Sequence, residues 1–203
     1  MAIRIITAPT VEPIDITAVA GQCRTGDLSS EADTVNGYIV AIRQKCANDL
    51  RRTLITTTYD LVLDAFPSPS NRNPFAALEI PLPPLQSVVS IKCMSTDLVL
   101  TTLDPTMYVV DTDSTPGRVM PAYGKAWPAT LDYPGSVRVQ FTSGYGDTAD
   151  DVPQCIKNWM LLNVANLFEN RESESVSDSR MSQIDLSTMA DSLLDPERWE
   201  VRV

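Results

Sequence analysis

Apolar residues recur with helical spacing in two long segments of the chain. In residues 30–52 they follow steps of four, three, four and four positions, with charged residues between them. This spacing places apolar side chains on one face of an α-helix. The stripe consists of Val35, Ile39, Ile42, Cys46 and Leu50. In residues 153–170 the stripe is wider, so we expect this second helix to be covered on more than one side. Its members are Ile156, Trp159, Met160, Val164, Leu167 and Phe168, and it is widened by Leu161, Leu162 and Ala165.

Residues 54–142 have a different texture, in which short β-branched runs alternate with turn residues and proline is frequent. Several short strands with turns at close spacing predict a small antiparallel sheet or sandwich. The runs are TLITTTYDLVL, SVVSIKC, DLVLTTL, MYVVD, RVMPAY and SVRVQFT. Before them, residues 13–26 predict a short helix that is N-capped by Asp15 and stopped near Gly26.

The helices on either side of the β-rich region each carry an apolar stripe that needs cover, so we expect them to pack together. The predicted class is therefore α+β, with a helical core of three to four helices and a β-rich antiparallel insertion. The expected boundaries are 1–53 and 151–195 for the discontinuous helical core, 54–150 for the insertion and 196–203 for a C-terminal tail.

Charge and composition narrow the possible chemistry. The 203 residues include 16 basic and 26 acidic side chains, giving a formal net charge of −10, and no histidine. The chain therefore lacks Ser-His and Cys-His nucleophile pairs, histidine metal sites and the usual general base near neutral pH. Its cysteines, Cys23, Cys46, Cys93 and Cys155, form no CxxC pair and fit no zinc spacing, so we expect reduced thiols that pack as small apolar groups. We expect no enzyme activity, no metal and no cofactor.

The segment FTSGYGDTADDVP, residues 141–153, combines glycines with carboxylates and ends in proline. A P-loop would need a lysine that this segment lacks, and an EF-hand would need ligands at fixed offsets and a closing glutamate. We interpret it as a strand end, a glycine turn and an acidic helix start, with Pro153 in the first turn. The segment DTDSTPG, residues 111–117, begins like a calcium loop but has proline where the invariant glycine belongs, so we also interpret it as a turn.

Several short motifs occur in an order and at spacings that together are more specific than any one of them. AWPAT is followed by PGSVRVQFTSGYGD and by an apolar helix that begins with VP and ends in FENRE, all within residues 117–172. This segment resembles the head–tail connector (head-completion, or adaptor) proteins of long-tailed double-stranded-DNA phages. PIDITAVAGQCR matches the opening helix of that family, and LPPLQSVVSIK also fits in order. The resemblance covers most of residues 12–172, and the stretch after residue 172 departs most from the pattern.

The resemblance implies a structural function without an active site. Proteins of this family assemble, as a rule in twelve copies, into a ring beneath the portal that extends the DNA channel. The expected partners are further copies of the chain, the portal protein, a head-closure (stopper) or tail-terminator protein, and double-stranded DNA that passes without sequence-specific binding. An acidic protein without a stripe of basic residues suits DNA that slides rather than sticks. The expected location is the neck of the virion, between capsid and tail.

The sequence also suggests residues that could contact a partner. Aromatic and arginine residues are common interface anchors, and Trp199 lies in a short tail between two arginines. The candidates are Trp127, Leu193, Leu194, Arg198, Trp199 and Arg202. We expect residues 184–203 to dock on a partner rather than to be needed for folding. The alternative is that the last helix of this segment, in residues 184–196, folds back on its own core. For Trp127, the alternative is that its indole side chain covers the core of the β-rich region within the same subunit.

No run approaches the roughly 18 consecutive apolar residues of a membrane span, and the first residues lack the apolar core of a secretory signal. We therefore expect synthesis in the host cytoplasm and no membrane partner. Two other functions remain open. One is a different tail-completion or neck protein, and the other, from another class, is a small histidine-free hydrolase that uses a pair of carboxylates.

Overall fold

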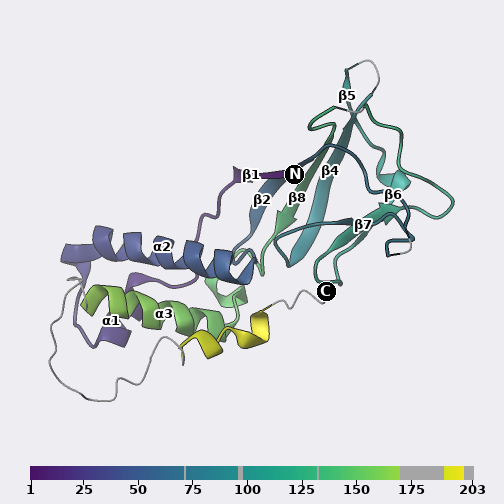
Figure 1. Ribbon diagram of the computed structural model, residues 1–203. Coiled ribbons are helices and arrows are strands. Elements are labelled where there is room, and N and C mark those ends of the chain that lie inside the picture. The colour runs from purple at the N-terminus through teal and green to yellow at the C-terminus, as the bar shows by residue number, and fades with distance from the viewer. Residues whose placement is uncertain (71, 96–97, 132, 170–189, 199–203) are drawn as a thin grey trace, which may run out of the picture. The chain divides into compact units, whose positions relative to one another are not determined.

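The computed structural model describes residues 1–203 apart from 71, 96–97, 132, 170–189 and 199–203. They form two compact units (Figure 1). The β unit comprises Met1–Thr10 and Thr56–Tyr145, and the helical unit comprises Val11–Ile55 and Gly146–Val203. The predicted α+β class is confirmed by helices and antiparallel sheets in one chain.

The helical unit is built on three helices, α1 (Ile16–Cys23), α2 (Ala32–Leu50) and α3 (Gln154–Glu169). Both α1 and α2 pack against α3, as predicted for the helices on either side of the β-rich region (Figure 1). All five members of the predicted α2 stripe are buried. The predicted cap of α1 is confirmed, because the Asp15 carboxylate accepts a hydrogen bond of 2.7 Å from the Ala18 amide. The helix ends at Cys23, close to the predicted stop near Gly26, but the residue that caps it in a left-handed conformation is Arg24 rather than a glycine.

The predicted α3 stripe holds for most of its length. Ile156, Trp159, Met160 and Val164 are buried. Leu167, in contrast, is 39% exposed. It lies in the last turn of the helix, next to Phe168, which is half-buried. Helical spacing alone gives the direction of a side chain but not how far its cover extends along the helix.

The β unit contains two antiparallel sheets. The larger has the strand order β1-β2-β8-β4-β5. Its strands are β1 (Ala2–Thr7), β2 (Thr57–Leu63), β8 (Val137–Ser143), β4 (Leu85–Met94) and β5 (Leu100–Thr102). The smaller sheet has the order β3-β7-β6. Its strands are β3 (Leu78–Glu79), β7 (Arg118–Pro121) and β6 (Tyr108–Asp111).

One apolar core lies between the two sheets. The larger sheet contributes Leu61, Leu85, Ile91, Val137, Val139 and Phe141, and the smaller sheet and its flank contribute Leu78, Ile80 and Val119. Along β8 the burial alternates from one residue to the next, as the sequence predicted for a strand with one covered face. The six strands predicted from β-branched runs are confirmed.

Two strands were not predicted, and one of them changes the boundaries of the units. Residues 1–53 were expected to belong to the helical core, but β1 pairs with β2 and so joins the β unit. The strand joins the sheet through its backbone ladder with β2, in which Ile3 and Ile5 lie opposite Leu61 and Tyr59, and both isoleucines stay exposed. The second strand, β3, has only two residues and is too short for a periodic signal.

The interpretation of residues 141–153 is confirmed. Strand β8 ends at Ser143, a 3-10 turn (η3) spans Ala149–Asp151, and α3 starts at Gln154. The Asp151 carboxylate accepts hydrogen bonds from the Thr148 amide and hydroxyl at 2.9 and 2.8 Å, which lowers the pKa of Asp151. A side chain at Gly146 would collide with this carboxylate, so glycine is required here for packing. The carboxylates therefore shape the start of the helix.

Candidate interaction surfaces

The described part of the chain offers little for catalysis. No three His, Cys, Asp or Glu side chains are grouped there so as to hold a metal ion. The four cysteines are free thiols, and burial raises the pKa of Cys46 to about 12. A thiol with such a pKa is protonated at neutral pH and is a poor nucleophile. Among the described helices none is long and apolar enough to cross a membrane.

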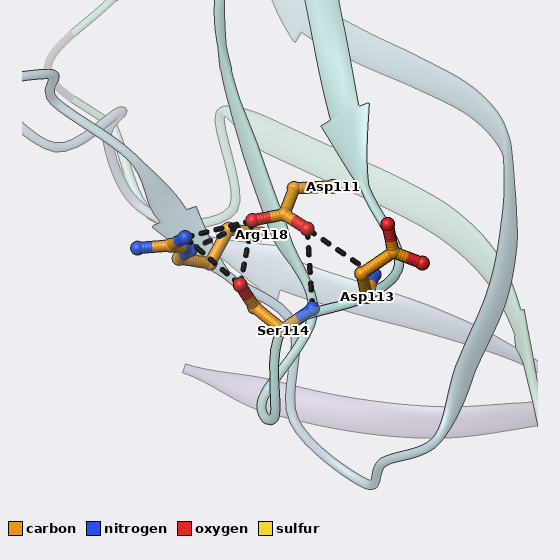
Figure 2. A network of polar contacts seen from close by, with 4 residues as sticks. All are labelled: Asp111, Asp113, Ser114 and Arg118. Atoms are coloured by element: carbon orange, nitrogen blue, oxygen red, sulfur yellow. Dashed lines mark hydrogen bonds and ion pairs between the residues drawn. The ribbon is translucent and has the colours of Figure 1, made fainter.

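The loop that resembles a calcium site is closed by its own side chains (Figure 2). One Asp111 oxygen accepts hydrogen bonds from the amides of Asp113 and Ser114, at 3.2 and 3.1 Å. The other accepts from the Ser114 hydroxyl and from Arg118, both at 2.7 Å. The Ser114 and Arg118 contacts lower the pKa of Asp111 to about 2. The loop is thus a turn stabilised by an ion pair, as its proline indicated.

This network predicts a pH-dependent contribution to stability. The pKa of Asp111 in the folded chain, about 2, lies below the value of about 4 for an unstructured aspartate. The ionised group therefore stabilises the fold above about pH 4, and this contribution is lost as the pH falls toward 2. We expect Asp111→Asn to lower the melting temperature at pH 6 and to match the parent near pH 2. Asp113→Asn, which removes a charge from the same loop, should change little, and an equal effect of both substitutions would contradict this account.

The predicted candidate Trp127 lies in the β unit beside an apolar groove. Its ring stacks on Phe66 with a centroid distance of 4.5 Å and an interplanar angle of 2°. Its indole N–H donates to the Ala76 carbonyl at 2.8 Å, and the residue packs against the β core. These contacts favour the alternative in which Trp127 covers the core of the β unit. A role of Trp127 as an interface anchor stays a prediction.

The groove itself has a volume of about 580 Å³, and its lining includes five prolines and four aromatic residues. Phe75 and Tyr123 line it and are strongly exposed. An exposed apolar patch of this kind often marks a contact site. The groove was not predicted, because its lining comes from two segments, residues 65–76 and 120–130, that are far apart in the sequence.

The candidates near the C-terminus divide into three groups. Leu194 is only 1% exposed, so its expected role at an interface is replaced by a role in the core of the helical unit. Leu193 is half-buried, and Arg198 is exposed and lies 3.4 Å from Asp195. Trp199 and Arg202 lie outside the described residues.

Further contacts tie the same segment to the helical unit. The indole N–H of Trp159 donates to the Asp191 carboxylate at 3.1 Å. The Arg52 side chain donates to the Glu197 carbonyl at 2.8 Å. The alternative in which the last helix folds back on its own core is therefore favoured for residues 190–198. The earlier part of this predicted helix, residues 184–189, lies outside the described residues.

The burial of Leu194 predicts that this segment is needed for folding. Leu194→Ala removes apolar contacts and leaves a cavity, which typically costs about 2–5 kcal/mol. We expect a clear drop in the denaturant midpoint, measured by circular dichroism. Leu193→Ala, at the half-buried neighbour, should cost less. If Leu194→Ala were as stable as the parent, the segment would not be part of the core.

Comparison with known proteins shows similarity at the level of structure. No family model matches the sequence, and no curated protein matches it. The fold is similar to a chain in the neck of an empty gene transfer agent (GTA) particle computed with C6 symmetry, with 20% identity and a TM-score of 0.78. It is also similar, at 20% identity, to chains in the virion of a native GTA particle and in the neck of a native GTA particle computed with C12 symmetry, with TM-scores of 0.77 and 0.71.

The similarity extends over the whole chain. Each comparison covers 100% of this chain and 97% of the other chain. Both units and their order are therefore shared with the GTA chains. At this level of identity the comparison establishes a common fold, and it agrees with the resemblance found in the sequence.

Proposed function

We propose that this chain is a structural protein of the neck of a virion, with no catalytic role. The observation that carries the proposal is the full-length match to chains of GTA necks, which includes both the β unit and the helical unit of this chain. The order of motifs in residues 117–172, which resembles head–tail connector proteins, supports the same function independently. No observation on the described residues favours the hydrolase.

The finer proposal is a ring between the portal and the tail. The GTA necks were computed with C6 and C12 symmetry, so the similar chains come from cyclic assemblies. Twelve copies of this chain would form a ring that extends the DNA channel, with the portal on one side and a head-closure or tail-terminator protein on the other. Such a ring needs two different faces on each subunit. One face of each subunit contacts the other face of its neighbour, and the rotation from one subunit to the next closes the ring.

Mass measurement tests the ring. The purified chain is examined by mass photometry over a range of concentrations, alone and mixed with the portal protein of the same particle. We expect a species of twelve times the subunit mass of 22.3 kDa, alone or added to the portal. A chain that stays monomeric in both cases would overturn the ring. A closed ring that does not bind the portal protein would support the function of a different neck or tail-completion protein.

A further inference from the structure

The outer face of the larger sheet, opposite the apolar core, carries an unusual arrangement of charge. Lys92 on β4 lies directly opposite Arg138 on β8. Farther along the same face, Arg4 lies opposite Asp60. Three basic side chains and one acidic side chain thus share this face, in a protein whose net charge is −10. We call Arg4, Asp60, Lys92 and Arg138 the basic face.

On the basic face, Lys92 and Arg138 share one carboxylate, that of Asp60, and are not neutralised by it in full. Like charges directly opposite each other on an antiparallel pair destabilise the sheet. Neither side chain forms an ion pair with any residue that the structure describes. An anion placed between the two cations would relieve this repulsion.

The two cations also border a hollow that could receive such an anion. Its volume is about 220 Å³. Ser90 and Gln140, which lie opposite each other in the register, line it beside Lys92 and Arg138 and could donate hydrogen bonds. Asp60 lines it as well, so the hollow retains a net positive charge. A side-chain carboxylate is small enough to enter it.

The protein itself is rich in carboxylates, which could bind these cations, and the carboxylates are unevenly distributed between the two units. By sequence, the helical unit contains 18 acidic and 10 basic residues, whereas the β unit contains 8 and 6. The carboxylates of α3 and its approach include Asp147 and Asp150, both exposed. One copy can therefore offer a basic face and another an acidic unit.

We propose that the basic face of one copy binds the acidic helical unit of a second copy, with a carboxylate seated between Lys92 and Arg138. This contact joins two different surfaces, as a cyclic assembly requires, and it rests on the proposed ring. DNA is the less suitable occupant, because a phosphate backbone is repelled by a chain of net charge −10.

Charge reversal tests the basic face. In Arg138→Glu the introduced carboxylate lies opposite Lys92 and neutralises it within the subunit. We expect a melting temperature equal to or above that of the parent, and assembly weakened by at least about tenfold, because like charges now meet across the contact. The matched control is Arg72→Glu, an exposed site of the same unit that does not line the hollow, which should assemble like the parent. Assembly is measured by mass photometry, with portal if the parent requires it.

Crosslinking identifies the occupant. A carbodiimide joins lysine amines to carboxylates in contact, and rings mixed from ¹⁴N- and ¹⁵N-labelled chains separate contacts between copies from contacts within one copy. We expect Lys92 to be joined to an Asp or Glu in 11–55 or 146–203 of another copy. A Lys92 joined only within its own chain, or to no carboxylate, would overturn the proposal even if Arg138→Glu failed to fold.

The outcomes separate this contact from the ring itself. If the parent forms rings and Arg138→Glu forms them equally well, the basic face is not the interface and the neck function stands. If the parent forms no ring, both proposals fail. If Arg138→Glu assembles normally but loses binding to a fluorescent double-stranded DNA that the parent binds, the face serves DNA and the contact between copies is overturned.

Discussion

Val164→Asp is expected to unfold the helical unit. Val164 is fully buried on the side of α3 that faces the other helices. A carboxylate there would be ionised without a partner, or would have to bind a proton at a cost in free energy. The penalty of several kcal/mol is comparable to the total stability of a domain, about 5–15 kcal/mol. Circular dichroism should show loss of helix, and size-exclusion chromatography should show aggregation.

Leu167→Asp is the matched control for this substitution. It places the same charge one turn farther along the same helix, at a side chain that is 39% exposed. We expect this variant to fold and to melt within a few degrees of the parent, because exposed substitutions usually change stability by less than about 0.5 kcal/mol. If both variants unfolded, α3 would have to be covered farther toward Glu169 than the structure shows. If both folded, α3 would not belong to the core.

The second large effect is expected in the β unit, from Phe141→Ala. The Phe141 ring is fully buried between the sheets and stacks on Tyr59 with a centroid distance of 5.4 Å. Truncation of a buried aromatic side chain typically costs about 3–5 kcal/mol, because contacts are lost and a cavity remains. Tyr123→Ala, at a fully exposed ring, is the control and should leave stability unchanged. The measurement is chemical denaturation followed by near-UV circular dichroism.

The sequence predicted those elements in which a periodic signal was long enough. The five stripe residues of α2 are all buried, and β8 shows the alternation expected of a strand with one covered face. Helix ends were less certain, because Gly26 looked like a stop while Arg24 adopted the left-handed conformation. The approach to α3 was predictable because its turn and cap are local: Gly146 leaves room for the Asp151 carboxylate, which accepts hydrogen bonds from Thr148.

Features that depend on distant parts of the chain were not predictable. Strand β1 carries apolar residues, but its partner β2 starts about 50 residues later, so nothing local assigned it to the β unit. The groove beside Trp127 and the opposition of Lys92 to Arg138 both depend on how segments pair. For Leu194, a short apolar helix after a polar stretch was compatible with core and with interface alike. Only the contacts of Asp191 and Glu197 with the helical unit distinguish them.

The division of the helical unit in sequence has a consequence for its synthesis. Ile55 and Gly146 form a bridge within that unit, yet about 90 residues of the β unit lie between them. At a translation rate of about 5–20 residues per second, α2 precedes the first residues of α3 by roughly 5–20 s. During this interval strands β2 to β8 are made and can pair with β1, while the apolar stripe of α2 still lacks the α3 surface that will cover it. The nascent chain therefore completes its sheets first, and the α2 stripe is the surface that a ribosome-associated chaperone would meet.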